Sequence, residues 1–290
     1  MERNHIYIKA LAKVNLALDI IGKRADGYHE ISTIMQSLEL YDGLYIKKVF
    51  KPNYLKVISN LPWLPEDERN LAYRAAKYMK ERFGIEEGIF INIDKAIPSS
   101  AGLGGGSADC AATLVGIRNL FGLPITDEEL CELSVMFGAD VPFCIKGGLA
   151  HATGIGEVLV PLPPLPNAYV VLAKPNIITS TEDVFSKFDM ATAGRRPDIE
   201  KIIYFINKQD LEGVAKNMAN VLESVTATAH PIIFQLKETM LENGALGAMM
   251  TGSGSTVFGI FAENEMAKKT FQVIKNKYTE INNVFLSTLK

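Results

Sequence analysis

The sequence predicts an α+β fold made of two domains. Two observations support this prediction: strand-like and helix-like segments are mixed without the regular alternation of a doubly wound sheet, and the most proline-dense segment, 158–167, lies near the middle of the chain. Prolines in that segment favour an extended path, which suits a domain connector. We therefore expect an N-terminal domain over residues 1–160 and a C-terminal domain over residues 161–290.

The N-terminal domain is expected to combine short strands with helices. Alternation of apolar and polar residues predicts strands at 6–10, 16–21, 44–49, 55–58 and 89–93. Helix signals cover residues 70–83 (from a capping Asn70 to Gly84), 108–121 (ending before Gly122) and 126–137 (a capping box of Thr126 and Glu129, closing at Gly138).

The C-terminal domain shows the same mixture. Strands are predicted at 169–173, 248–251, 256–261 and 284–289, and helices at 199–206, 211–222, 231–242 and 265–276. The segment Gly252-Ser253-Gly254-Ser255 joins two of these strands and is either a plain glycine hairpin or part of a binding site.

Composition narrows the class of protein. The 290 residues are 48% hydrophobic and 22% charged, which is typical of a globular protein, and the net charge of -3 gives no support for a nucleic-acid or membrane partner. Three cysteines and four scattered histidines indicate neither a disulfide framework nor a metal site. The chain has no apolar segment of signal-peptide or membrane-spanning length. We expect a cytoplasmic monomer or homodimer that acts on a small molecule.

The most informative segment is a glycine-rich loop between a predicted strand and a predicted helix. It comprises Pro98, Ser99, Ser100, Ala101, Gly102, Leu103, Gly104, Gly105, Gly106, Ser107 and Ala108. Glycines allow backbone N–H groups to converge on a phosphate, and the following helix start adds its positive dipole end. The Walker pattern is absent because no lysine follows the glycines, and Ser107 occupies the last glycine position of the dinucleotide pattern. A tight structural connection is the alternative.

Two residues stand out as candidates for chemistry. Asp140 lies in a short turn just after Gly138 and before Val141-Pro142, which we do not expect to continue a helix. It is either a turn-former or a catalytic carboxylate. Lys13 interrupts the apolar run ALAKVNLAL and is either a solvated lysine or a partner for that carboxylate.

Three segments together resemble the GHMP kinases, the family of galactose, homoserine, mevalonate and phosphomevalonate kinases. PSSAGLGGGSA (98–108) resembles the central motif of that family, 10–31 its first motif and 250–261 its third. The resemblance implies an N-terminal ribosomal-protein-S5-domain-2-like domain, a C-terminal ferredoxin-like α/β sandwich and an active site in the cleft between them. It also implies that the glycine-rich loop binds ATP, with Mg²⁺ carried by the nucleotide, and that the loop at 252–255 packs against it.

Segments 12–18, 22–30 and 137–148 are similar to the branch of the family that phosphorylates the 2-hydroxyl of 4-diphosphocytidyl-2-C-methyl-D-erythritol, in the non-mevalonate route to isoprenoid precursors. By this resemblance Asp140 accepts the hydroxyl proton and Lys13 lies beside it. The resemblance also implies that Asn15 hydrogen-bonds the substrate and that Thr181 lies near it. Tyr28 and Phe185 are implied to lie on the two faces of the cytosine ring, with His29 at its edge. Glu182 stands where the family often has proline. The alternatives are a kinase of another alcohol and a non-catalytic nucleotide sensor.

Overall fold

The computed structural model describes residues 4–290, and these divide into two compact units. The first unit holds residues 4–12, 40–99 and 104–147, and the second holds residues 13–39, 100–103 and 148–290. The units do not follow a single cut along the chain, because 13–39 and 100–103 group with the C-terminal part. The domain boundary at residue 160 stays a prediction, and residues 1–3 of the predicted N-terminal domain lie outside the described residues.

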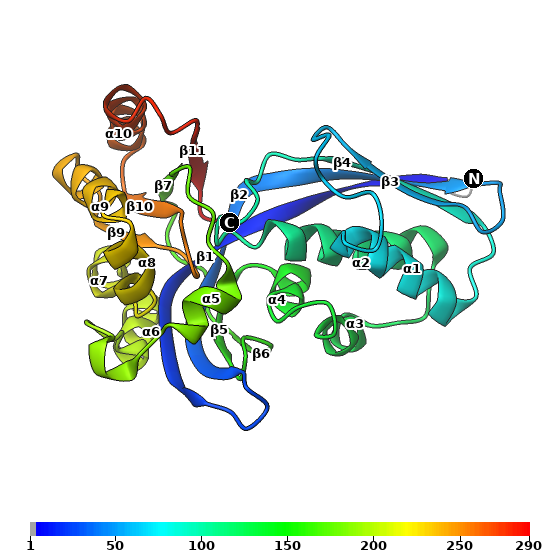
Figure 1. Ribbon diagram of the computed structural model, residues 1–290, viewed down its shortest axis with the longest axis horizontal. Coiled ribbons are helices and arrows are strands. Elements are labelled where there is room, and N and C mark those ends of the chain that lie inside the picture. Colours follow the sequence, from blue (N-terminus) through cyan, green and yellow to red (C-terminus); the bar gives the residue numbers. More distant parts are fainter. Residues whose placement is uncertain (1–3) are drawn as a thin grey trace. The chain divides into compact units, whose positions relative to one another are not determined.

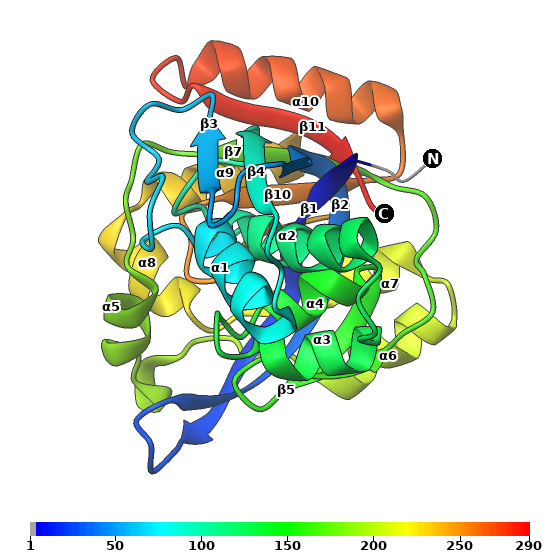
Figure 2. The same ribbon diagram turned by 90° about the vertical axis from the view of Figure 1, so that its right-hand side faces the viewer.

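The first unit is a sheet backed by helices. Its strands are parts of β1 (His5–Lys23) and β2 (His29–Val49) with β3 (Leu55–Ser59) and β4 (Gly88–Asp94); its helices are α1 (Leu71–Phe83), α2 (Gly105–Phe121), α3 (Asp127–Ser134) and α4 (Val141–Lys146). β4 pairs antiparallel with β2 and parallel with β3. α1 and α2 lie side by side, and α1 packs on β3 (Figure 1, Figure 2). Apolar residues of these strands and helices, such as Ile46, Ile91 and Leu114, form its core.

Local signals set the helix ends in this unit. The Asn70 side chain accepts a hydrogen bond from the Ala72 N–H, and Gly84 ends α1 in the left-handed conformation. The predicted capping box of Thr126 with Glu129 is present at the start of α3. These predictions are confirmed, although α3 ends at Ser134 rather than at residue 137.

Val141-Pro142 does not continue the preceding helix, as predicted, since α3 ends at Ser134, but the pair begins a new short helix that was not predicted. α4 begins at Val141 with Pro142 in its first turn, and Asp140 is the N-cap residue. Proline lacks a backbone N–H, but N–H groups in the first turn of a helix have no intrahelical acceptor, so the position tolerates it. β1 likewise unites the two strands predicted at 6–10 and 16–21.

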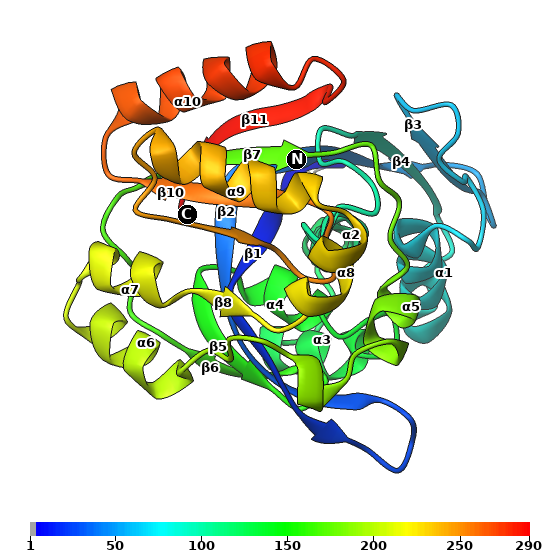
Figure 3. The same ribbon diagram turned by 60° about the vertical axis from the view of Figure 1, so that its left-hand side comes forward.

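The second unit is built on two groups of strands. In one, β2 pairs with β5 (Leu149–Thr153), β5 pairs with β6 (Val158–Pro161), and β1 pairs with β8 (Ala219–Asn220). The other is an antiparallel sheet of order β11 (Asn283–Thr288), β7 (Tyr169–Lys174), β10 (Val257–Phe261), β9 (Gly247–Met250). Helices α9 (Ile232–Glu242) and α10 (Asn264–Lys277) cover one face of this sheet (Figure 3). The remaining helices are α5 (Thr181–Ser186), α6 (Ile199–Asn207), α7 (Leu211–Asn217) and α8 (Glu223–Ala229), with a 3₁₀ turn at Met190–Thr192.

One sequence prediction for this unit is corrected. The helix predicted at 211–222 ends at Asn217, because Ala219 and Asn220 form β8 and pair in parallel with β1. Tertiary pairing therefore overrides the helical pattern of the segment. The segment 158–167 begins as β6 and has no regular secondary structure from residue 162 to β7, and its role as a connector stays a prediction.

Candidate active site

From Gly104 onwards the glycine-rich loop belongs to the first unit, where it leads directly into α2. Gly104 adopts a left-handed conformation (φ 70°, ψ 17°), and α2 begins at Gly105, before the predicted start at residue 108. No side chain caps this end of the helix. The first backbone N–H groups of a helix lack intrahelical acceptors and lie at the positive end of the helix dipole. This start of α2 therefore has the backbone geometry of a phosphate-binding site.

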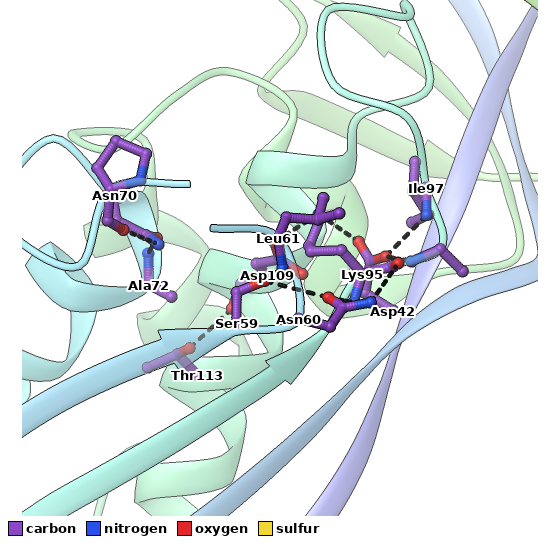
Figure 4. Close-up of polar contacts among 12 residues, drawn as sticks. Asp42, Ser59, Asn60, Leu61, Asn70, Ala72, Lys95, Ile97, Asp109 and Thr113 are labelled. Atoms are coloured by element: carbon purple, nitrogen blue, oxygen red, sulfur yellow. Dashed lines mark hydrogen bonds and ion pairs between the residues drawn. The ribbon is translucent and has the colours of Figure 1, made fainter. Parts of the chain in front are cut away.

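A buried ionic cluster lies beneath the start of α2 (Figure 4). The Lys95 ammonium contacts Asp42 Oδ2 at 2.5 Å and Asp109 Oδ2 at 2.7 Å, and all three side chains are almost fully buried. Asp42 Oδ1 also accepts hydrogen bonds from the backbone N–H groups of Ala96 and Ile97, at 2.7 and 2.8 Å. The cluster thus joins β2, the segment entering the glycine-rich loop, and the helix that leaves it.

Burial raises the pKa of the Asp109 carboxyl to about 7; the Lys95 ammonium opposes this shift and the Asp42 carboxylate adds to it. The pKa of Lys95 is raised, because its two carboxylate partners outweigh the effect of its burial, which lowers the pKa. The sequence analysis predicted no role for Asp42, Lys95 or Asp109. An aspartate embedded in the apolar first turns of α2 is the signal that could have revealed the cluster.

Asp140 also belongs to the first unit, at the start of α4. Its backbone has helical angles (φ -80°, ψ -12°), and its side chain makes no cap hydrogen bond to α4. The turn that carries Asp140 lies beside the glycine-rich loop, since a methyl group placed on Gly138 would lie 3.9 Å from Ser107 Oγ. Two segments that the sequence separates by 30 residues thus meet within this unit.

Lys13 lies in the second unit within a buried polar network. Its ammonium donates to Asn15 Oδ1 at 2.9 Å, and Asn15 Nδ2 donates to Thr33 Oγ1 at 2.8 Å. Thr33 in turn donates to the Ala17 carbonyl at 2.6 Å. Lys13 is 4% exposed and Asn15 2%, so the interpretation of Lys13 as a solvated lysine is wrong. Their side chains lie on the same face of β1, as the spacing of two predicts.

The glycine loop at 252–255 packs against residues 100–103 of the glycine-rich loop, as the family resemblance implied. A methyl group placed on Gly102 would lie only 2.2 Å from the Thr251 carbonyl oxygen, and Thr256 N donates to the Ala101 carbonyl at 3.4 Å. The Lys13 N–H donates to the Leu103 carbonyl at 3.0 Å. Segments of all three predicted motifs therefore meet in the second unit.

Asn220 holds the loop at 252–255 in place, and sequence reasoning missed it. Its side-chain amide donates to the carbonyls of Met250 and Gly252, at 2.9 and 2.8 Å. Its Oδ1 accepts from the N–H of Leu222 at 3.0 Å. The segment had been assigned to a helix, so no signal pointed to a buried asparagine.

In the second unit one contact joins His29 to Phe185, and another joins Thr181 to the third motif. The His29 and Phe185 rings lie 5.5 Å apart between centroids at an angle of 44°, and burial followed by the nearby Lys23 lowers the pKa of His29. Tyr28 is 60% exposed on the hairpin between β1 and β2. Thr181 Oγ1 lies 3.0 Å from Ser253 Oγ, which links α5 to the third motif. Lys13 and Asp140 belong to different compact units, so their pairing stays a prediction.

Comparison with known proteins decides the family. Profiles described as GHMP kinases N terminal domain and GHMP kinases C terminal match residues 70–148 and 202–280. A 4-diphosphocytidyl-2-C-methyl-D-erythritol kinase of Clostridium botulinum (strain Alaska E43 / Type E3) is 46% identical, covering 94% of this chain and 97% of its own. The chain belongs to the GHMP kinase family. A relative of the same name from Caldicellulosiruptor bescii is 45% identical to this GHMP kinase, over 94% of this chain and 96% of its own.

Solved structures agree with this assignment. A crystal structure of 4-(cytidine 5'-diphospho)-2C-methyl-D-erythritol kinase matches this GHMP kinase with a TM-score of 0.82 at 31% identity, covering 98% of this chain and 99% of that one. Homoserine kinase from Cytophaga hutchinsonii shares the fold, with a TM-score of 0.81 at 22% identity over 100% and 96% of the two chains. The predicted two-domain α+β GHMP kinase fold is confirmed. Among the described residues, no helix has the length and apolar character needed to cross a membrane.

Proposed function

We propose that this GHMP kinase transfers the terminal phosphoryl group of ATP to the 2-hydroxyl of 4-diphosphocytidyl-2-C-methyl-D-erythritol, giving the 2-phosphate and ADP. The observation that carries the proposal is an identity of 43–46% to kinases bearing that name, over at least 93% of this chain. The reaction belongs to the non-mevalonate route to isoprenoid precursors.

The start of α2 and the glycine-rich loop hold the ATP phosphates in this proposal. Phosphoryl transfer needs in-line positioning and neutralisation of the charge on the transferred group more than covalent help from the protein. Uncapped N–H groups at Gly105 and Gly106 supply part of that neutralisation. Magnesium enters as part of the nucleotide substrate and neutralises phosphate charge. Such a magnesium ion keeps most of its waters and takes its other ligands mainly from the phosphates.

Asp140 is the proposed acceptor of the hydroxyl proton. Asp140 lies at the N-cap position of α4, in the turn beside the glycine-rich loop, and a carboxylate within hydrogen-bond reach of a substrate hydroxyl can accept its proton. Lys13 is the proposed partner that stabilises developing negative charge. Asn15 orients it, because a lysine with a fixed hydrogen-bond acceptor samples fewer positions than a solvated one.

The proposed cytosine site consists of Tyr28, His29 and Phe185, with Thr181 close by. Exposed Tyr28 offers a ring for stacking, and base stacking on an aromatic ring contributes about 1–3 kcal/mol. The contact between His29 and Phe185 supports their sharing one site. With its pKa lowered, His29 stays neutral near pH 7 and presents one donor and one acceptor to the base edge.

A coupled ADP-release assay over a panel of alcohols tests the proposal. We expect ADP release with 4-diphosphocytidyl-2-C-methyl-D-erythritol and none with homoserine, mevalonate or galactose. Turnover of another alcohol alone would identify a different GHMP kinase, and binding of substrate and ATP without turnover would identify a sensor. Asp140→Asn and Lys13→Met are expected to abolish most turnover, whereas the capping variant Thr126→Ala serves as a control that alters only stability.

A cytoplasmic location and a monomeric or homodimeric state are part of the same proposal. Buried, unbridged Cys110 and Cys131 suit a reducing compartment. Light scattering coupled to size-exclusion chromatography measures the oligomeric state, and a mass above that of a dimer contradicts this part of the proposal.

A further inference from the structure

The ionic cluster of Asp42, Lys95 and Asp109 lies directly against the backbone of the glycine-rich loop. A methyl group placed on Gly105, the first residue of α2, would lie 3.4 Å from Lys95 Nζ. The Lys95 and Asp42 side chains are 3% and 0% exposed, and that of Asp109 is 6% exposed. The charge of this cluster therefore acts on the start of α2 through the protein interior, where screening is weaker than in water.

The cluster contains two carboxyl groups but only one ammonium group. Two carboxylates share a single ammonium, so the fully ionised cluster carries a net charge of -1 in a buried place. Such a surplus charge is costly, and one carboxylate of a pair that shares a site binds a proton readily.

Hydrogen bonding distinguishes the two carboxylates. Both Asp42 oxygens accept hydrogen bonds, one from two backbone N–H groups and the other from Lys95. Asp109 Oδ2 accepts from Lys95, but its Oδ1 is buried without a partner among the residues that the structure describes. Ionised Asp42 is stabilised by its donors, whereas ionised Asp109 leaves one oxygen uncompensated.

The surroundings of Asp109 add no further charge. The charged groups that act on it are Lys95, at the end of β4, and Asp42 on β2. From α1, Arg74 acts on the thiol of the neighbouring Cys110, whose pKa burial raises above its usual range. The raised pKa of Asp109, about 7, agrees with the geometric argument.

We propose that Asp109 is a positioning residue of the nucleotide loop that takes up a proton when nucleotide phosphates bind at the start of α2. This inference rests on the proposed function in one respect, namely that the loop holds a nucleotide. The negative charge of a phosphate bound at the start of α2 disfavours ionisation of the nearby Asp109 carboxyl. Protonation of Asp109 makes the cluster neutral. The cluster then no longer repels the phosphates that the N–H groups of the loop attract. Lys95, held between Asp42 and Asp109, then keeps both ends of the loop together.

A binding-linked proton makes the affinity depend on pH. Nucleotide binding promotes protonation of Asp109, and by reciprocity protonation of Asp109 strengthens nucleotide binding. Raising the pH removes that proton and therefore weakens nucleotide binding. If bound phosphates raise the pKa of Asp109 by about one unit, the Kd for the nucleotide increases up to about tenfold between about pH 6.5 and pH 9. The proton comes from solvent, and no bond of the nucleotide changes.

Isothermal titration calorimetry with a non-hydrolysable ATP analogue tests this directly. Binding is measured at pH 8 in buffers of different ionisation enthalpy, because the dependence of the heat on the buffer gives the number of protons exchanged. Excess magnesium is present, because a bound cation lowers the pKa of the terminal phosphate and keeps the nucleotide phosphates ionised at that pH. We expect the wild type to take up several tenths of a proton. Asp109→Asn and Asp42→Asn are both expected to show none, since Asp42→Asn leaves Asp109 alone with Lys95 and ionised.

Thr126→Ala is the matched control, because it destabilises the same unit without touching the cluster, and it is expected to keep the wild-type proton uptake. A kinetic readout accompanies it: the KM for ATP rises with pH in the wild type and stays flat in Asp109→Asn. Nucleotide binding by the wild type without proton uptake, or equal uptake in Asp109→Asn, overturns this inference and leaves the proposed function standing. Absence of nucleotide binding by the wild type overturns both. The wild-type titration decides the inference even where a variant fails to fold.

Discussion

Gly102 is the position at which the glycine-rich loop and the third motif meet most closely, and Gly102→Ala is expected to separate them. Gly102 has φ +73°, and an added methyl group would lie 2.2 Å from the Thr251 carbonyl oxygen and 3.1 Å from its carbon. An L-residue at such a φ costs about 1–2 kcal/mol. Displacing the backbone that the methyl group meets adds about 1–3 kcal/mol. The expected loss of unfolding free energy is therefore about 2–5 kcal/mol.

Gly148→Ala separates these two contributions. Gly148 lies in the same unit with φ +76°, but an added methyl group there meets nothing within 4 Å. We expect it to lose only the conformational part, about 1–2 kcal/mol. Urea unfolding of both variants measures the losses, and ADP-release kinetics measures the KM for ATP, which should rise in Gly102→Ala alone. Equal losses in the two variants would refute the claim that close packing, rather than backbone conformation, makes this glycine necessary.

Three further predictions concern charge and hydrogen bonding. Lys13→Met should lower kcat at least about 100-fold at saturating substrates, measured by ADP release, and an unchanged kcat would remove Lys13 from the chemistry. Asn220→Ala should cost about 1–3 kcal/mol in urea unfolding, because the Met250 and Gly252 carbonyls lose their donor; a neutral result would contradict that role. Asp109 has a pKa of about 7 in the folded chain against an ordinary 3.8, so its contribution to stability falls as pH rises between these values. Unfolding curves of Asp109→Asn from pH 4 to 8 should lack this decline, and an unchanged pH dependence would contradict the assignment.

Much of the fold could be predicted because its signals are local. Asn70 and Gly84 mark the ends of α1 through caps that depend only on neighbouring residues. Apolar patterns likewise revealed β4, which alternates apolar with polar residues at its end, and β10, which is a continuous apolar run. The short helix α4 was missed because Pro142 was interpreted as a helix stop, although a first turn accepts it.

Other features depend on contacts that no local pattern contains. The segment 218–222 has helical composition, yet Ala219 and Asn220 pair with β1. This pairing lets the Asn220 side chain donate to the Gly252 carbonyl in the third motif. The predicted site shows the same contrast. The glycine-rich loop and its helix were visible from spacing alone, whereas Asp42 and Lys95 are 53 residues apart and gave no joint signal.

The resemblance to a family supplied what residue patterns left open. Lys13 and Asp140 could each be interpreted in two ways from sequence. Burial of Lys13 against Asn15 removes the solvated alternative for the lysine. The assignment of both residues to catalysis stays a prediction that variants can test.

Steady-state ADP release by the wild type with 4-diphosphocytidyl-2-C-methyl-D-erythritol as acceptor, compared with Asp140→Asn, tests the central claim most directly. We expect saturable release of one ADP for each 2-phosphate formed, together with a loss of about 100-fold or more in kcat for Asp140→Asn despite retained nucleotide binding. Wild-type protein that binds ATP but releases no ADP with this acceptor, or Asp140→Asn with wild-type turnover, would contradict it.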